Sequence, residues 1–215
     1  MSAPDDRDPA PSESATVAPP SAPPSYRPHD WEPLRTERLL IRVMTMDDVD
    51  DVHAYQSLPE VCRYLLYEPR TRERVAEKIG EWLGMGRLAH VGDDLELAIE
   101  LLDGPSEGRV IGHSYFKLTS TEDLSGEIGW ALHPDFERQG YASEAARAML
   151  GYAFGTLGLH RVTAELDPRN AASIALCLRL GMREEALFRE HMWFKGEWGD
   201  TGVYAILASE WAARA

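Results

Sequence analysis

The chain has 215 residues, a length that fits one domain with a substantial core and argues against a second full domain. Its net charge of -14, from 36 acidic and 22 basic residues, argues against non-specific binding to nucleic acid, which depends on basic surface. No apolar run reaches the roughly 18 residues that a membrane helix needs, and the first 30 residues lack the pattern of a secretory signal. We therefore expect a cytosolic protein with no membrane partner.

The first 30 residues are rich in proline, alanine and serine and contain almost no large apolar side chains. Such a segment cannot bury enough surface to offset the entropy that is lost when it becomes ordered. We predict a disordered or extended arm over residues 1–30 and a single folded domain over residues 31–215.

The first part of the folded domain contains one predicted strand and two predicted helices. A short apolar run over residues 38–43 predicts the strand. Thr45 can cap a helix that runs to about Leu58, because aspartates in its first turn suit the positive end of the helix dipole. Thr71 can cap a second helix, which runs through Trp82.

The remainder alternates between strands and helices. Strands are predicted at residues 95–102, 109–118, 127–132, 161–166, 186–194 and 201–207. Apolar side chains at helical spacing predict one helix from Ala142 to Ala153 and a shorter one around Ile174, which Gly181 ends. Strands with interleaved helices predict a mixed α/β (α+β) fold.

Two cysteines, Cys62 and Cys177, lie far apart and form no CxxC pair. A zinc site built on thiolates and a disulfide framework are therefore both unexpected, and we predict no metal. Cys177 falls on the apolar stripe of the second of these helices, which is typical of an inert buried thiol.

The stretch from Glu127 to Ala145 combines a strand, a loop and the start of a helix. Small residues at Gly140 and Ala142 would let a ligand approach the backbone. The unpaired N–H groups and the dipole of the following helix would then hold an anion such as a pyrophosphate. The side chains around this loop sum to a negative charge, so backbone N–H groups are expected to do most of the binding. The predicted cradle consists of Arg138, Gln139, Gly140, Tyr141, Ala142 and Ser143.

This loop resembles the acetyl-CoA signature of the GNAT superfamily, Q/R-x-x-G-x-G/A, and more closely its RimJ/RimL-type branch. The resemblance covers about residues 34–211. Two further blocks support it, from Asp167 to Met182 and from Lys195 to Asp200. It implies a mixed, mostly antiparallel, twisted sheet of six or seven strands flanked by helices, with acetyl-CoA as co-substrate. One departure is Glu137, which stands where the signature has Gln or Arg.

Glu127 is the candidate catalytic base. A primary ammonium has a pKa of about 8 to 10.4 and must lose a proton before it attacks a thioester. A carboxylate in a partly dry site can accept that proton, directly or through water. The resemblance implies that the strand beginning at Glu127 separates from its neighbour to admit acetyl-CoA. The alternative is a glutamate at a strand edge that lies in water or pairs with an arginine.

Other roles follow from the same resemblance. The backbone N–H of Ala131 or Leu132 would stabilise the charge that develops on the thioester carbonyl. Ser173 is the candidate proton donor to the leaving thiolate, and its alternative role is that of a hydroxyl at a helix start. Asn170 would bind the pantetheine amide or cap that helix. Tyr141 would pack near the adenine or lie on the surface.

The sequence therefore predicts an acetyl-CoA-dependent N-acetyltransferase that acetylates a primary amine, on a protein N-terminus or a small molecule, by direct attack. The alternative is a non-catalytic acyl-CoA-binding sensor or docking module, which would need neither Glu127 nor Ser173. Both a monomer and a homodimer, paired through a strand edge near the C-terminus, are consistent with the sequence. The acceptor groove is expected to be lined by Tyr55, Tyr64, Tyr67, His191, Trp193 and Trp198.

Overall fold

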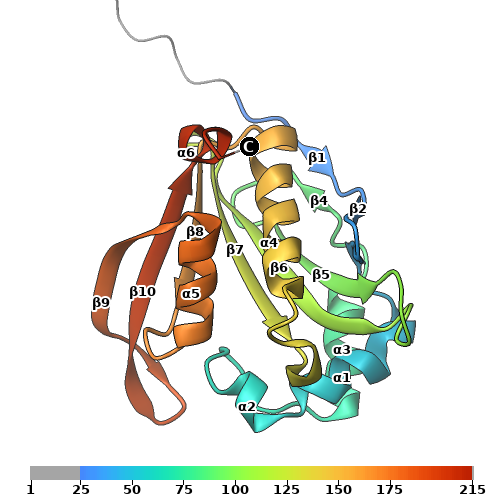
Figure 1. Ribbon diagram of the computed structural model, residues 1–215. Helices are drawn as coiled ribbons and strands as arrows, with labels where there is room; N and C mark the ends of the chain where they lie inside the picture. The colour runs from blue at the N-terminus through green and yellow to red at the C-terminus, as the bar shows by residue number, and fades with distance from the viewer. Residues whose placement is uncertain (1–24, 215) are drawn as a thin grey trace, which may run out of the picture.

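The computed structural model describes residues 25–214, so residues 1–24 of the arm predicted over residues 1–30 lie outside the described residues. The described strands form an eight-stranded sheet in the order β2-β3-β5-β6-β7-β8-β10-β9 and a two-stranded sheet of β1 and β4 (Figure 1). Their bounds are β1 His29–Asp30, β2 Leu34–Arg35, β3 Leu39–Val43, β4 Arg87–Leu88, β5 Asp94–Leu101, β6 Val110–Ser120, β7 Ser125–Leu132, β8 Arg161–Leu166, β9 Arg183–Phe194 and β10 Glu197–Leu207.

Two helices cover one face of the large sheet, in front of it in Figure 1. These are α4 (Tyr141–Gly151), continued by a π-helical turn η3 (Tyr152–Thr156), and α5 (Ala171–Leu180). The predicted stripe on α4 packs into the main core through Ala145, Met149 and Leu150, all of which are buried. Gly181 ends α5 in the left-handed conformation, with a φ of 90°, as its position predicted.

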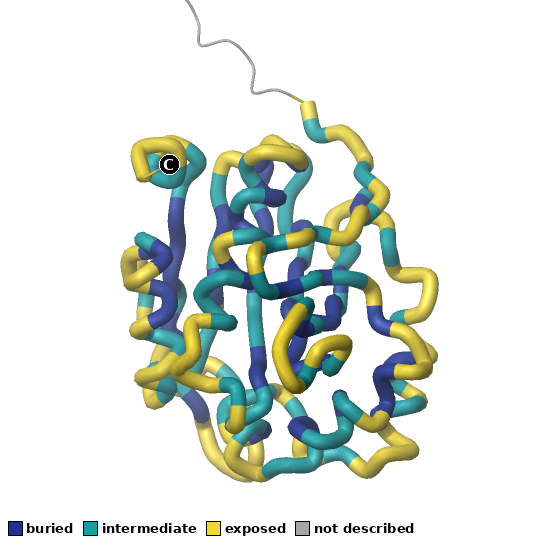
Figure 2. Tube along the Cα trace, turned by 45° about the vertical axis from the view of Figure 1, so that its right-hand side comes forward, coloured by how far each residue is buried: buried dark blue, intermediate teal, exposed yellow. Residues whose placement is uncertain are grey.

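A smaller core lies on the opposite face, under the N-terminal helices. A 3-10 turn η1 (Met46–Asp48) leads into α1 (Val49–Gln56), followed by α2 (Pro59–Cys62) and α3 (Arg72–Trp82). Their apolar side chains pack against Ala98 of β5 and Val110 of β6. Figure 2 shows that buried residues lie mainly inside the molecule and that exposed residues lie mainly along the connecting loops.

The pairing of β7 with β8 is the one parallel contact in the described sheet, and it is short. It joins Ser125 to Arg161, Gly126 to Val162 and Glu127 to Thr163. Beyond Glu127, β7 continues to Leu132 without pairing to β8. On its other edge, β8 pairs with β10 from Arg161 to Leu166. The sheet is therefore open between β7 and β8 from this point onward.

The fold class expected from the sequence is confirmed, with two differences. The sheet has eight described strands rather than six or seven, because Leu34–Arg35 adds a two-residue strand beside Leu40–Ile41. Residues 25–30, which the sequence assigned to the arm, are part of the fold: His29–Asp30 pairs with Arg87–Leu88, and the Tyr26 hydroxyl donates a hydrogen bond to the Leu88 carbonyl at 3.0 Å. A stretch of so few apolar residues did not reveal these long-range contacts.

Candidate active site

The loop before α4 forms a tight turn. A 3-10 turn η2 (Pro134–Phe136) follows β7, and Arg138 and Gly140 then adopt positive φ values of 59° and 89°. Gly140 is the N-cap of α4, so the first N–H groups of the helix face outward at this point. Gln139 closes the turn, because its side-chain amide donates to the Asp135 carbonyl at 2.8 Å. A cavity of about 470 Å³ lies against this turn, and we call it the α4 cavity.

Glu144, in the first turn of α4, is fully engaged by the chain before β3. Its carboxylate accepts hydrogen bonds from the Thr36 hydroxyl at 2.6 Å, the Arg38 backbone N–H at 2.9 Å and the Arg38 Nε at 2.7 Å. Burial opposes ionisation, but these hydrogen bonds prevail and hold the pKa of Glu144 below its ordinary value. The negative charge of Glu144 is thus compensated, and its side chain does not line the α4 cavity.

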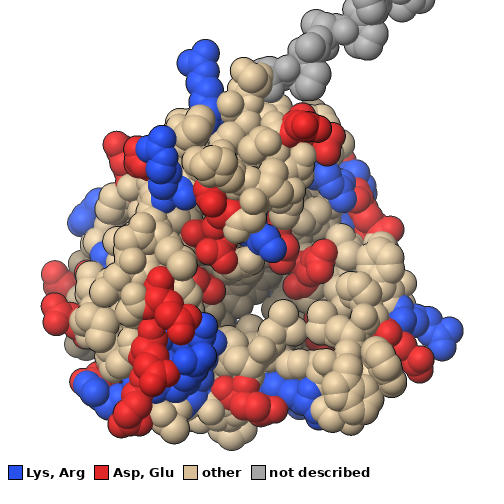
Figure 3. Space-filling view, turned by 180° about the vertical axis from the view of Figure 1, so that it is seen from behind, with Lys and Arg blue, Asp and Glu red and all other residues tan. Residues whose placement is uncertain are grey.

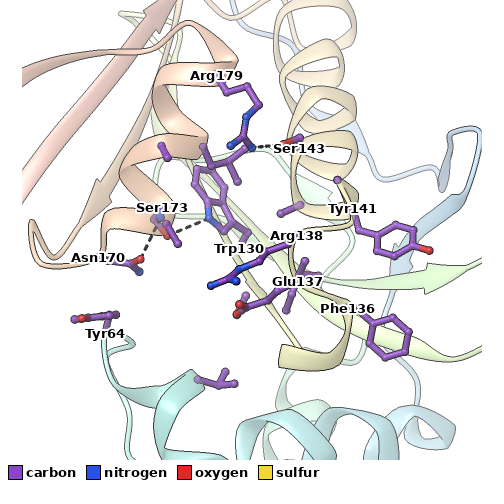
Figure 4. Close-up of a pocket in the computed structure, with 18 of the residues that line it drawn as sticks. Tyr64, Trp130, Phe136, Glu137, Arg138, Tyr141, Ser143, Asn170, Ser173 and Arg179 are labelled. Carbon is purple, nitrogen blue, oxygen red and sulfur yellow. Dashed lines mark hydrogen bonds between the residues drawn. The ribbon is translucent and has the colours of Figure 1, made fainter.

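Charged side chains at the α4 cavity come from two helices and the loop between β7 and α4. Figure 4 shows Glu137 and Arg138 pointing into the cavity beside one another. Arg179 of α5 lies across from them and donates a hydrogen bond from its Nη1 to the Ser143 hydroxyl at 2.9 Å. The net negative charge that the sequence predicted for the side chains around this loop therefore does not describe the cavity. Glu144 is neutralised by its partners, and Arg179 adds a positive charge.

The floor of the α4 cavity carries Trp130, Ser173 and Asn170. The Trp130 indole N–H donates to the Ser173 hydroxyl at 3.3 Å, and the Asn170 side chain accepts the Ser173 backbone N–H at 3.1 Å (Figure 4). Asn170 is thus the N-cap of α5, one of the two roles that the sequence allowed. The Ser173 hydroxyl proton remains available to another acceptor, because the hydroxyl acts as acceptor toward Trp130.

The structure brings together nine of the ten residues that the sequence proposed for cofactor binding. Gln139 is the exception, because its side chain closes the turn and its carbonyl accepts a hydrogen bond from the Arg38 Nη1. Tyr141 lies under the Arg38 guanidinium, whose central carbon is 4.4 Å from the ring centroid. The nine lining residues are Ala131, Leu132, Arg138, Gly140, Tyr141, Ala142, Ser143, Asn170 and Ser173.

Glu127 lies in a second, smaller cavity of about 130 Å³ beneath the β9–β10 hairpin, which we call the hairpin cavity. Because side chains alternate along a strand, Glu127 belongs to the sheet face opposite Ile128 and Trp130. Tyr64, from the segment after α2, lines both cavities. The hairpin cavity is lined by Tyr64, Leu66, Glu127, Glu165, Leu166, Asp167, Met192, Phe194, Gly199, Asp200 and Thr201.

Glu127 has the electrostatic setting of a base. Burial raises the pKa of Glu127, the charge of Glu165 raises it further, and Lys117 opposes both effects. Among the described residues it has no ion pair, so the alternative of a glutamate held by an arginine is not what the structure shows. Lys117 is its cross-strand neighbour on β6.

Most of the aromatic residues expected to line the acceptor groove do not line the hairpin cavity. Tyr64 does, whereas Tyr55 is fully buried against His113, with its hydroxyl 3.1 Å from the His113 Nδ1. Trp193 and Trp198 are largely exposed and pack edge to face on each other. Because side chains alternate along a strand, Trp193 and Trp198 point away from the hairpin cavity, while Met192 and Phe194 point into it.

Sequence reasoning missed three contributors to these cavities. Arg179 and Trp130 reach the α4 cavity, and Glu165 reaches the hairpin cavity. A local signal existed only for Glu165, which shares a strand face with Thr163, the partner of Glu127. The approach of Arg179 to Ser143 joins two helices and has no sequence signature.

Comparison with known protein families identifies residues 38–183 as an acetyltransferase (GNAT) domain. The uncharacterised N-acetyltransferase YnaD of Bacillus subtilis is 34% identical over 178 residues, which are 83% of this chain and 98% of that protein. The putative ribosomal N-acetyltransferase YdaF of the same organism is 28% identical over 166 residues, or 68% of this chain and 91% of that protein.

Solved structures show the same fold. A GNAT-family acetyltransferase from Bacillus anthracis has a TM-score of 0.72 at 32% identity and covers 83% of this chain and 99% of that chain. Spermidine N-acetyltransferase from Vibrio cholerae, solved with CoA and spermine, has a TM-score of 0.67 at 20% identity, covering 82% of this chain and 99% of that one. Among the described helices, none is long and apolar enough to cross a membrane.

Proposed function

Because the chain belongs to the GNAT acetyltransferase family and is an N-acetyltransferase, we propose that it moves an acetyl group from acetyl-CoA to a primary amine with Glu127 as the base. One observation carries the proposal. The sheet opens between β7 and β8 directly after Glu127, with the α4 cavity and the hairpin cavity meeting at Tyr64. A donor and an acceptor bound in these two cavities would face each other through the opening.

The α4 cavity fits the phosphate and pantetheine parts of acetyl-CoA. Its volume of about 470 Å³ falls within the usual range for ligand sites. Gly140 leaves the helix N–H groups accessible, because a Cβ there would sit 3.3 Å from the Arg38 Nη2 and crowd the turn. Arg138 and Arg179 add positive charge at the wall. The unpaired edge of β7 at Ala131 and Leu132 offers backbone groups to the pantetheine amides.

Acetyl-CoA supplies an acetyl thioester, and the residues of this chain move the protons. Glu127 accepts a proton from the acceptor ammonium, since its raised pKa makes it a stronger base than an ordinary glutamate. A backbone N–H at Ala131 or Leu132 is the donor offered to the carbonyl oxygen. Ser173, whose hydroxyl proton is not used by Trp130, donates that proton to the leaving sulfur and regains one from the attacking nitrogen, which gives up its second proton as the amide forms. Cys177 is buried and its thiol pKa is raised to about 12 by desolvation, so it stays protonated and takes no part.

The acceptor is a primary amine on a protein N-terminus or on a small molecule. YdaF and the ribosomal protein uS5 alanine N-acetyltransferase of Escherichia coli, which is 26% identical over 108 residues, support the first type. The Vibrio cholerae spermidine enzyme supports the second. The cytosolic location and the oligomeric state, monomer or homodimer, stay predictions.

The test is thiol release from acetyl-CoA, measured for the wild type and Glu127→Gln against peptides and small amines. Loss of the base should lower kcat by about 10²- to 10⁴-fold while acetyl-CoA affinity is retained. Glu122→Gln, an exposed carboxylate that lines neither cavity, is the matched control. Equal turnover in Glu127→Gln would remove the base assignment. Acetyl-CoA binding without turnover of any amine would favour the sensor hypothesis.

A further inference from the structure

The hairpin cavity is lined by four carboxylates and, among the described residues, by no lysine, arginine or histidine. Two of the four are occupied. Asp167 is held by the Arg169 guanidinium at 2.6 Å, and Asp200 accepts the Glu190 backbone N–H at 2.8 Å. Glu127 and Glu165 have no hydrogen-bond or ion-pair partner within the part of the chain that the structure describes. These two carboxylates are the ones that a ligand can reach.

Glu127 and Glu165 lie on one face of the sheet at the point where it opens. Thr163 is opposite Glu127 in the parallel register, and Glu165 is two residues further, about 6.6 Å along the strand. Glu127 is half-buried and Glu165 is exposed, so they mark an inner and an outer position. Apolar side chains of Leu66, Leu166, Met192 and Phe194 complete the wall.

Other observations on this face of the sheet also indicate negative charge that is not compensated. The Glu96 Oε2 atom is shielded from solvent and has no hydrogen-bond partner among the described residues. Glu96 is opposite Tyr115 in the sheet, and burial together with the charge of Glu127 raises the pKa of the Tyr115 hydroxyl. Figure 3, the view from behind, shows a hollow with acidic side chains gathered around it. Lys117, beside Glu127, is the cation that opposes this charge, and it makes no ion pair there among the described residues.

Unpaired carboxylates at close range repel each other and are costly to desolvate, so a site of this kind is stabilised by cations. One ammonium group cannot serve both residues during catalysis. Glu127 loses its charge when it takes the proton of the reacting amine, whereas Glu165, at the outer position, takes no part in that transfer. The separation of the two residues and the apolar wall between them suit a methylene spacer.

Building on the proposed function, we propose that Glu165 is a specificity-determining residue that binds a second positive charge on the acceptor. The acceptor class is then a small diamine, whose reacting nitrogen lies at Glu127 and whose second ammonium lies at Glu165. Acceptors that carry a carboxylate near the amine are repelled by the same pair of residues.

Three acceptors with the same four-carbon chain provide the test: 1,4-diaminobutane, n-butylamine and 4-aminobutanoate, which end in an ammonium, a methyl and a carboxylate group. In the wild type, kcat/KM should decrease in that order, with the diamine roughly tenfold above the monoamine. In Glu165→Gln the preference for the diamine over the monoamine should disappear, because the KM for the diamine rises. Because the charge of Glu165 also raises the pKa of Glu127, any loss of rate from a weaker base should appear equally with n-butylamine, so the ratio of the two acceptors isolates the effect of the second charge. Glu107→Gln, an exposed carboxylate outside both cavities, should behave as wild type.

Three results overturn the inference while the proposed function survives. The first is equal use of the diamine and the monoamine by the wild type. The second is a preference for the diamine that Glu165→Gln leaves unchanged. The third is a higher kcat/KM with a tripeptide amide that has uncharged side chains than with the diamine. If no amine is turned over although acetyl-CoA binds, the proposed function itself fails.

Discussion

The α4 cavity and the hairpin cavity lie on either side of the opening between β7 and β8, and they differ in how their charges are compensated. At the α4 cavity, Glu144 is neutralised by Arg38, and Arg138 and Arg179 reach the wall. At the hairpin cavity, Glu127 and Glu165 form no ion pair among the described residues, although Lys117 lies beside Glu127. The chain thus compensates its negative charge where an anionic donor would bind and leaves it uncompensated where a cationic acceptor would bind.

This difference separates two ways of recognising a ligand. The α4 cavity depends on backbone N–H groups and on a glycine conformation, so it is set by local geometry. The hairpin cavity depends on side-chain charges from different strands, so its preference can be changed by one substitution. The proposed donor site should therefore be sensitive to backbone changes, and the proposed acceptor site to changes of charge.

After Glu127, the largest effect is expected at Ser173, on the floor of the α4 cavity. Ser173→Ala removes the proposed proton donor and should lower kcat on the order of 10²-fold with little change in acetyl-CoA affinity. Ser173→Thr retains a hydroxyl and should restore most of the rate. Stopped-flow or steady-state thiol release measures both. A kcat for Ser173→Ala within about twofold of wild type would show that Ser173 only occupies the first turn of α5.

The acidic face should carry a cost in stability that depends on pH. Burial, with the charge of Asp94, raises the pKa of Glu96 from 4.5 to about 8. Between these values the folded protein keeps a proton that the unfolded chain has lost, so the free energy of unfolding falls as the pH rises. Because Glu96→Gln cannot titrate, its loss of stability from pH 6 to pH 8 should be smaller by about 1–2 kcal/mol.

Urea unfolding at the two pH values measures this change. Glu107→Gln, in an exposed loop, should keep the wild-type slope. If Glu96→Gln and the wild type lose equal stability over this range, Glu96 is ionised in the folded protein and the buried charge is compensated in another way.

Acetyl-CoA binding in the α4 cavity should respond to a single added methyl group. Gly140→Ala forces an alanine into a φ of 89° and places its Cβ against Arg38, so acetyl-CoA should bind about tenfold more weakly. Gly158→Ala is a matched control, with a φ of 65° but no atom within 4 Å of the added Cβ. It should cost stability without weakening the ligand. Calorimetric titration distinguishes the two, and equal affinities would remove Gly140 from the cradle.

The smallest effect is expected for one exposed cation. Arg179→Gln should weaken acetyl-CoA binding about threefold to fivefold at low salt and less at high salt, because exposed charge pairs are screened. The diamine preference should not change, since Arg179 lines only the α4 cavity. Arg74→Gln, on α3, serves as the control. A change in acceptor preference would show that the two cavities are not electrostatically separate.

Most of the local structure could be predicted. The cap at Thr71, whose hydroxyl accepts the Arg74 N–H at 3.2 Å, and the left-handed Gly181 were both found from residue type alone. The helix expected to run from Thr45 to about Leu58 is a 3-10 turn followed by α1, which ends at Gln56, and Pro59 begins the separate short helix α2. The two-residue strands β1 and β4 were missed because each depends on the other, far away in the sequence, and β2 was missed because two residues are too few to show a period.

The sequence by itself determined the alternation of strands and helices, the glycine turn before α4 and the presence of Glu127 on the strand that leads to that turn, because caps, turns and periodicity are local properties of the chain. Only the tertiary structure decided which charges remain uncompensated. Arg38 reaches Glu144 across 106 residues, and the short pairing of β7 with β8 brings Glu165 beside Glu127. Such contacts depend on how the sheet closes and opens, which no stretch of the sequence specifies by itself.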